Sequence, residues 1–133
     1  MKNLKDWIKE HEGLRLKPYK DTVNKTTIGY GRNLQDNGIT PEEADYLFNN
    51  DLQRCLNDLN KFKWYTEQPN HIKDALTDMC FNLGINRLRG FKKMIAAIEA
   101  KDYTKAAIEA LNSKWATQVG RRAKNVALKI RQG

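Results

Sequence analysis

The feature that most constrains how this chain can fold is a long run with helical periodicity that begins at Thr40. Thr40 can cap a helix, Pro41 suits the first helical position, and Glu43 can complete a capping box. Apolar side chains follow at helical spacing as far as Phe62, with Asp51 as a polar interruption. The pattern predicts a helix of about twenty residues, roughly 30 Å long. A helix of that length spans a small domain, so it can join two lobes.

Most of the remaining sequence also has a helical pattern. The apolar spacing of residues 4–11 predicts a short helix that Gly13 ends, and a further helix begins near Pro69 and stops at Gly84. Toward the C-terminus we expect three helices and one loop: helices at 91–100, at 103–112 and from 121 nearly to the end, and a loop at 84–90.

The segment between the first helix and Thr40 has a different composition. Segments 16–21 and 26–30 are short and rich in Tyr, Thr and Ile, and residues 22–25 separate them. This pattern predicts a small β-hairpin. The expected fold class is therefore α+β and mostly helical. A small N-terminal lobe carries the hairpin, and the long helix joins it to an all-helical C-terminal lobe.

Composition and charge limit the partners of the chain. Its 133 residues suit one domain, and 24 Lys and Arg against 16 Asp and Glu give a net charge of +8. Such a charge favours an anionic partner, which could be nucleic acid, a membrane surface or an acidic polymer such as a cell wall. The longest apolar run is short and no signal peptide is visible. We therefore expect no membrane insertion, and accumulation in the cytoplasm of the producing cell.

Cysteine and histidine usage gives no sign of a metal or cofactor. Cys55 and Cys80 are far apart in the sequence and lie within apolar stripes, which predicts two buried free thiols. A disulfide between them can form, but nothing in the spacing favours it. His11 and His71 are isolated, and the sequence has no C-x-x-C or H-E-x-x-H motif. We expect no metal site and no cofactor.

One region carries residues suited to catalysis. Glu12 ends the first helix, where the helix dipole disfavours a carboxylate, as suits a proton donor. Asp21 enters the hairpin turn and Thr27 lies in the returning strand, so the hairpin brings them close enough to hold one water. Gly29 and Gly31 allow a ligand or another backbone to approach.

Each of the three polar residues also has an ordinary structural explanation. Glu12 can pair with a lysine or arginine, Asp21 can be a turn residue, and Thr27 can be a strand former. Taken together, however, they supply one acid, one carboxylate and one hydroxyl beside that carboxylate. Cleavage of a glycosidic bond requires this chemistry.

Three motifs in this region resemble those of the phage-type lysozymes, the bacteriophage endolysins of glycoside hydrolase family 24. They are E-G-L-R-L at 12–16, Y-K-D-T at 19–22 and T-I-G-Y-G at 27–31. The resemblance continues through later segments in the family's order and covers nearly the whole chain: 38–48, 81–84, 113–115 and 122–124.

The resemblance implies an enzyme, a muramidase. It would hydrolyse the β-1,4 bond between N-acetylmuramic acid and N-acetylglucosamine in bacterial peptidoglycan and so cause host cell lysis. Glu12 would be the general acid, while Asp21 and Thr27 would hold the attacking water. Inversion at the anomeric carbon is implied, with the two carboxyl groups roughly 6.5–9.5 Å apart. Four further positions match the family's sugar-binding cleft: Asn33, Phe81, Met94 and Glu109.

The resemblance also implies an organisation, and the sequence departs from the family at one position. One lysozyme domain would cover residues 1–133, with an N-terminal lobe at about 12–60 and a C-terminal lobe at about 61–133 plus the first helix. Arg32 stands where relatives often carry histidine, so any pairing of that histidine must be replaced or lost. Arg122 matches an arginine near the catalytic acid in relatives.

The implied partners follow from the same family. We expect peptidoglycan as substrate, a monomer, no nucleic acid, and dependence on a holin for release. The enzyme would stay in the host cytoplasm until lysis and then reach the periplasm and cell wall. Two alternatives remain open. A lytic transglycosylase would cut the same polymer without needing Asp21 or Thr27. A basic helical nucleic-acid-binding protein would fit the net charge and the Arg121-Arg122 pair.

Overall fold

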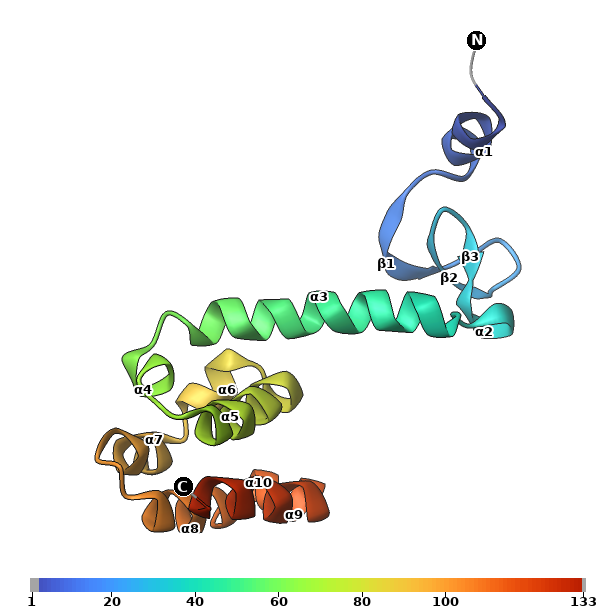
Figure 1. Cartoon of the computed structure of the whole chain (residues 1–133). Helices are drawn as coiled ribbons and strands as arrows, with labels where there is room; N and C mark the ends of the chain where they lie inside the picture. Colours follow the sequence, from blue (N-terminus) through green and yellow to red (C-terminus); the bar gives the residue numbers. More distant parts are fainter. Residues whose placement is uncertain (1–2, 133) are drawn as a thin grey trace. The chain divides into compact units, whose positions relative to one another are not determined.

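The structure is a computed structural model that describes residues 3–132. Within that range it has the predicted α+β class, with ten helices and one three-stranded sheet. The chain divides into an N-terminal unit, Met1–Leu47, and a C-terminal unit, Phe48–Gly133. Helix α3 (Pro41–Leu59) begins in the first and continues into the second (Figure 1). The expected lobe boundaries, with the first helix assigned to the later lobe, stay a prediction.

The first helix of the N-terminal unit, α1 (Leu4–Glu12), begins and ends as its sequence predicts. At its start the Asn3 side chain accepts a hydrogen bond from the Asp6 amide. At its end Gly13 has φ +71° and its N–H donates to the Lys9 carbonyl. Glycine adopts this backbone conformation without the steric cost that a side chain would bring. Glu12 is therefore fixed as the last residue of the helix.

A small antiparallel sheet follows α1. Its three strands are hydrogen-bonded in chain order: β1 (Arg15–Lys20), β2 (Thr26–Gly29) and β3 (Arg32–Asn33). The predicted hairpin is confirmed in β1 and β2, where Tyr19 lies opposite Thr27. The third strand was not predicted, because two residues are too few to show an alternating pattern. The sheet ends at α2 (Leu34–Asn37), a single helical turn that the sequence also did not reveal.

The capping box at the start of α3 is confirmed. The Glu43 amide donates to Oγ1 of Thr40 over 3.1 Å, and the Thr40 amide donates to Oε1 of Glu43 over 2.8 Å. These reciprocal bonds satisfy two backbone donors that the first helical turn would leave free. The helix runs for 19 residues, close to the predicted length.

The C-terminal unit is all-helical beyond α3. Its helices are α4 (Lys63–Thr66), α5 (Asn70–Leu83), α6 (Ile85–Arg89), α7 (Lys92–Glu99), α8 (Tyr103–Leu111), α9 (Lys114–Val119) and α10 (Arg121–Arg131). Helix α10 packs against both α5 and α8, and α7 packs against α8 (Figure 1). The core between these helices is aliphatic and fully buried, as the apolar face of α5 predicts. It includes Ile72, Leu76, Met79, Ile98 and Ile130.

The expected loop at 84–90 is wrong, because residues Ile85–Arg89 form α6. Leu88 of this helix is 0% exposed and belongs to the core, so tertiary packing stabilises a helix too short for its own periodicity to be visible. The short helices α4 and α9 were missed for the same reason. Of the two cysteines, Cys80 is buried as predicted, whereas Cys55 is only half-buried; both are free thiols.

Across residues 3–132, no helix combines the length and the apolar character that crossing a bilayer requires.

Arg32, the departure from the family pattern, binds Glu43 with both ends of its guanidinium. Nη1 donates to Oε1 over 2.8 Å and Nη2 to Oε2 over 2.6 Å, and Nη1 also donates to the Gly38 carbonyl over 3.1 Å. The arginine therefore ties β3 to the first turn of α3. The hydrogen bond from Arg32 is the largest effect on the pKa of Glu43. Together with the Thr40 amide, it lowers this pKa to about 2 from an ordinary value of 4.5.

This lowered pKa predicts how stability depends on pH. The Glu43 carboxylate contributes stability above pH 4.5, and the contribution is lost as the pH falls toward about 2. A Glu43→Gln variant should melt a few degrees below the wild type near neutral pH, with the gap closing in acid. Thermal unfolding at several pH values measures this. Glu42→Gln changes an exposed acid of the same helical turn and should show no such gap. A gap that is constant with pH would contradict the prediction.

Candidate active site

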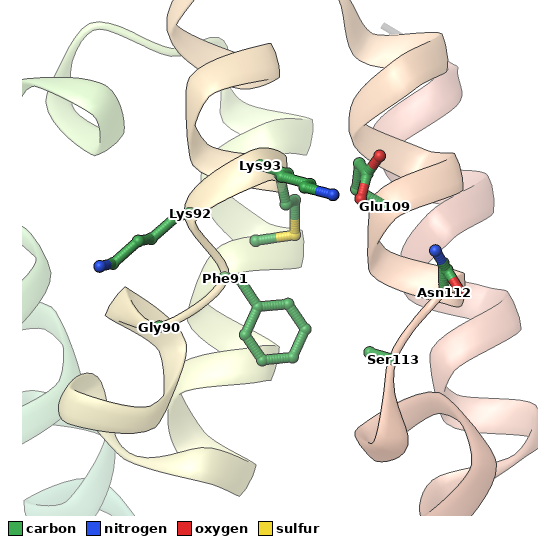
Figure 2. A pocket seen from close by; sticks show the side chains of 8 residues that line it. Gly90, Phe91, Lys92, Lys93, Glu109, Asn112 and Ser113 are labelled. Atoms are coloured by element: carbon green, nitrogen blue, oxygen red, sulfur yellow. The ribbon is translucent and has the colours of Figure 1, made fainter.

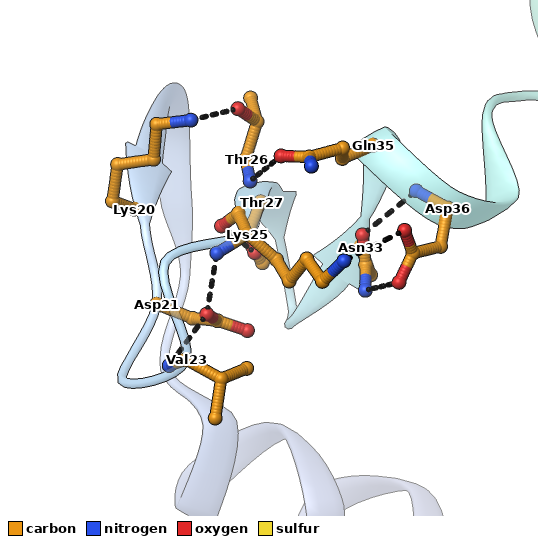
Figure 3. Close-up of polar contacts among 9 residues, drawn as sticks. All are labelled: Lys20, Asp21, Val23, Lys25, Thr26, Thr27, Asn33, Gln35 and Asp36. Atoms are coloured by element: carbon orange, nitrogen blue, oxygen red, sulfur yellow. Dashed lines mark hydrogen bonds and ion pairs between the residues drawn. The ribbon is translucent and has the colours of Figure 1, made fainter.

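Asp21 directly follows β1 and organises the hairpin turn. Its Oδ1 accepts from the Val23 amide over 3.0 Å and from the Lys25 amide over 2.8 Å, while its own amide donates to the Lys25 carbonyl over 3.0 Å (Figure 3). Asn24, at φ +63°, completes the reversal of the chain. Asp21 is therefore a turn residue, as one of its two explanations predicted. It fills this role with a single carboxylate oxygen.

Thr27 lies in β2 and is 3% exposed. Its hydroxyl donates to the Lys25 carbonyl over 2.8 Å. The peptide groups of Lys25 therefore hold both side chains, because its N–H binds Asp21 and its C=O binds Thr27. The structure brings these two predicted residues together through a common backbone partner that the sequence did not indicate.

The same hydrogen bonds leave acceptors on both side chains. Within residues 3–132, Oδ2 of Asp21 accepts no hydrogen bond. The hydroxyl hydrogen of Thr27 is committed to Lys25, so its remaining capacity is that of an acceptor. A water molecule between Asp21 and Thr27 would therefore donate one hydrogen bond to each of them.

Glu12 is exposed and its carboxyl group lies against the backbone of Gly31. A methyl group built on Gly31 would overlap Oε2 of Glu12 and come within 3.0 Å of its Cδ. Gly31, at φ +79°, lies in the turn between β2 and β3. No cation in the described part of the chain forms an ion pair with Glu12, so the ion-pair explanation of this residue is not seen. Glu12 thus lies beyond the end of β2, while Asp21 is held at its start and Thr27 lies within it.

Asn33, the first of the expected substrate-binding residues, has its amide group engaged. It caps α2, where Oδ1 accepts from the Asp36 amide over 3.0 Å and Nδ2 donates to Oδ2 of Asp36 over 3.0 Å (Figure 3). It also lines a groove of about 800 Å³ in the N-terminal unit. The wall of this groove includes Gly31, the residue against which Glu12 packs.

Met94 and Glu109 line one pocket of the C-terminal unit, a cavity of about 380 Å³ between α7 and α8. Figure 2 shows Lys93 extending toward Glu109 across it, with the Phe91 ring below. Met94 itself is 1% exposed and is mainly a core residue. The structure therefore places both residues at one pocket, and their role in binding substrate stays a prediction.

Phe81 does not line that pocket. Its ring lies 5.3 Å from the ring of Phe48, and it borders a different cavity, beside α3. Arg122 is likewise held within the C-terminal unit. Its guanidinium donates to both carboxylate oxygens of Asp78, over 2.9 and 3.0 Å, and to the Asp78 carbonyl over 3.2 Å.

The Gly31 contact predicts that two neighbouring glycines differ in tolerance. Gly29 and Gly31 both have positive φ, so alanine at either should cost about 1 kcal/mol of stability. At Gly31 the added methyl also meets the Glu12 carboxyl, whereas at Gly29 it meets nothing within 4 Å. Thermal unfolding should therefore show the larger loss for Gly31→Ala. In NMR, only this variant should shift the carboxyl carbon of Glu12. Equal effects of the two variants would contradict the contact.

Comparison with known proteins finds similarity along most of the chain. A family model described as phage lysozyme matches residues 9–132. The chain is 30% identical to probable T4-type lysozyme 2 of Dictyostelium discoideum, over 93% of this chain and 91% of that protein. It is 31% identical to an endolysin of Acyrthosiphon pisum secondary endosymbiont phage 1, over 81% and 73% respectively. It is also 30% identical to the pre-baseplate central spike protein Gp5 of Enterobacteria phage T4, over 98% of this chain and 28% of that protein.

The family match runs from the last turn of α1 to the end of α10 and so includes Glu12, Asp21 and Thr27. With a relative of similar length matched along nearly its whole sequence, the chain belongs to the phage lysozyme family and is a lysozyme.

Proposed function

We propose that this lysozyme hydrolyses the β-1,4 bond between N-acetylmuramic acid and N-acetylglucosamine of peptidoglycan. Glu12 is the general acid, and Asp21 and Thr27 position the water. The observation that carries the proposal is the arrangement around β2. Lys25, just before β2, holds Asp21 and Thr27 by its own peptide groups, and the Glu12 carboxyl lies against Gly31, two residues beyond the end of the same strand. Cleavage of a glycosidic bond needs one proton donor and one group that activates water.

The position of Glu12 supports its role as proton donor. It ends α1, its carboxyl group is exposed, and Gly31 leaves room for that group where any other residue would displace it. No ion pair within residues 3–132 engages its carboxyl group, so the group is available to a glycosidic oxygen. A positioned general acid typically accelerates such a step by roughly 10²–10⁴-fold.

The acceptors of Asp21 and Thr27 support their role toward water. A water whose hydrogens point to Oδ2 of Asp21 and Oγ1 of Thr27 has its lone pairs free for the anomeric carbon. The carboxylate then takes one of the water's protons as the new C–O bond forms, while Glu12 protonates the leaving oxygen. A displacement of this kind by water inverts the configuration at the anomeric carbon.

Removal of the acid should abolish turnover without unfolding the protein. Glu12→Gln is expected to lose roughly 10²–10⁴-fold in the rate at which it clears a suspension of purified peptidoglycan. Its melting temperature should stay unchanged, since the carboxyl makes no ion pair among the described residues. Glu99→Gln is the matched control, because Glu99 is the exposed last residue of α7 as Glu12 is of α1. Full activity of Glu12→Gln would refute the assignment.

The products distinguish this mechanism from the transglycosylase alternative. NMR during the first minutes of reaction should show the α-anomer of the new reducing end forming first. Early appearance of the β-anomer would rule out inversion. An anhydro sugar, detected by mass spectrometry of the released fragments, would instead mean that no water enters. In that case Asp21→Asn should leave the rate nearly unchanged, whereas the proposal expects a large loss.

We further propose host cell lysis as the setting of this activity, with the chain held in the host cytoplasm until a holin opens the membrane and then acting in the periplasm and cell wall. The endolysin among the relatives supports this setting. Expressed alone in a bacterial host, the chain should leave the culture turbid until chloroform permeabilises the inner membrane. Lysis without permeabilisation would contradict the need for a pore.

A further inference from the structure

The two cysteines face the same cavity of the C-terminal unit. Cys55 lies in α3 and Cys80 in α5, and both line a cavity of about 310 Å³ that Phe81 also borders. Both are free thiols. The catalytic proposal uses neither of them. Cys80 is 1% exposed, whereas Cys55 is half-buried and packs on the edge of the core. One thiol of the pair is thus reachable from solvent and the other is not.

The electrostatics of Cys80 agree with this shared position. Burial, which is the largest effect, acts together with Cys55 and with a smaller effect of Asp58 to raise the pKa of the Cys80 thiol to about 12. A disulfide requires its two sulfur atoms to approach each other, and the two cysteines line the same cavity.

We propose that Cys55 and Cys80 form a dithiol site that a low-molecular-weight disulfide, such as oxidised glutathione, converts into an intramolecular disulfide between α3 and α5. The geometry that supports this is the position of the two cysteines at one cavity, with Cys55 half-buried and Cys80 enclosed. The chemistry of the site does not depend on the muramidase mechanism, since none of its atoms belongs to the residues around β2.

The reaction proceeds in two balanced exchanges. Cys55, the accessible thiol, loses its proton, and its sulfur attacks one sulfur of the oxidant. The oxidant's S–S bond breaks, and the first leaving thiolate takes up a proton. Cys80 then loses its proton and attacks the Cys55 sulfur, and the second leaving thiolate departs and is protonated. Two protein thiols are oxidised, and one disulfide is reduced to two thiols.

The environment of Cys80 determines the order and speed of these steps. While Cys55 is free, its charge opposes ionisation of Cys80, but this charge is gone once Cys55 is in the mixed disulfide. Burial and Asp58 continue to disfavour the Cys80 thiolate, so the second exchange should be slower than the first. The mixed disulfide on Cys55 should therefore be observable as an intermediate.

The consequence would be a covalent link between the later part of α3 and the core helix α5. Such a bond lowers the conformational freedom of the unfolded chain. In a reducing cytoplasm the pair stays as thiols, and in an oxidising compartment it closes. If the enzyme reaches the periplasm as proposed, the link would form where the protein acts; this last step alone rests on the proposed function.

The test uses the full-length chain, reduced, freed of reductant and incubated without air with oxidised glutathione. Intact mass spectrometry should show a transient species carrying one glutathione. This species should give way to a chain that lacks the mass of two hydrogens. Peptide mapping should join Cys55 to Cys80, and the melting temperature should rise by about 5–10 °C. Retention of two free thiols, or a glutathione adduct that never resolves, would overturn the proposal.

Single variants separate the two roles. Cys80→Ala should stop at a stable glutathione adduct on Cys55, and Cys55→Ser should react far more slowly than the wild type because Cys80 is enclosed. If Cys80→Ala proves unstable, Cys80→Ser gives the same readout with the side-chain volume kept. Equal reaction rates of Cys55→Ser and the wild type would refute Cys55 as the point of entry. Wall-clearing activity measured in parallel tests the muramidase separately, since dithiol closure does not require Glu12.

Discussion

The peptide groups of Lys25 are the constraint on which the candidate site depends. Its N–H fixes one oxygen of Asp21 and its C=O fixes the hydroxyl of Thr27, so the relative position of the two side chains is set by backbone geometry. Groups held in this way need little further ordering when substrate arrives. Thr27 is also the one residue that is fully buried among the described residues of the N-terminal unit. The centre of this unit is therefore a hydrogen-bonded hydroxyl, with no aliphatic core around it.

The C-terminal unit has the opposite character. Its centre is a continuous set of buried aliphatic side chains from α5, α7, α8 and α10, and burial of such side chains is the main favourable term in folding. The polar interactions of the N-terminal unit lie instead at its junctions. Arg32 connects β3 with the end of α2 and the start of α3. The C-terminal unit therefore supplies much of the chain's stability, whereas Glu12, Asp21 and Thr27 lie in the N-terminal unit.

The sequence predicted those features that have a local cause. The capping box at Thr40, the glycine end of α1 and the closeness of Asp21 and Thr27 all follow from interactions within a few residues. The elements missed were β3, α2, α4, α6 and α9, which are too short for a period and are held by packing or by side-chain caps. The sequence could not predict the role of Lys25, because this residue acts through backbone atoms that every residue carries. The T-x-G-x-G motif did indicate a close approach at Gly31, although the approaching group is the Glu12 carboxyl.

Structural and catalytic explanations of a residue can hold together when they concern different atoms. Asp21 uses Oδ1 to close the turn, and this use orients Oδ2, the oxygen available to water. Thr27 donates its hydrogen to the strand turn and keeps its oxygen as an acceptor. Asn33 differs, because both ends of its amide bind Asp36, which leaves the second N–H of Nδ2 and one lone pair of Oδ1 for any other partner. Asn33 can thus still both donate and accept a hydrogen bond, whereas the carboxylate of Asp21 can only accept.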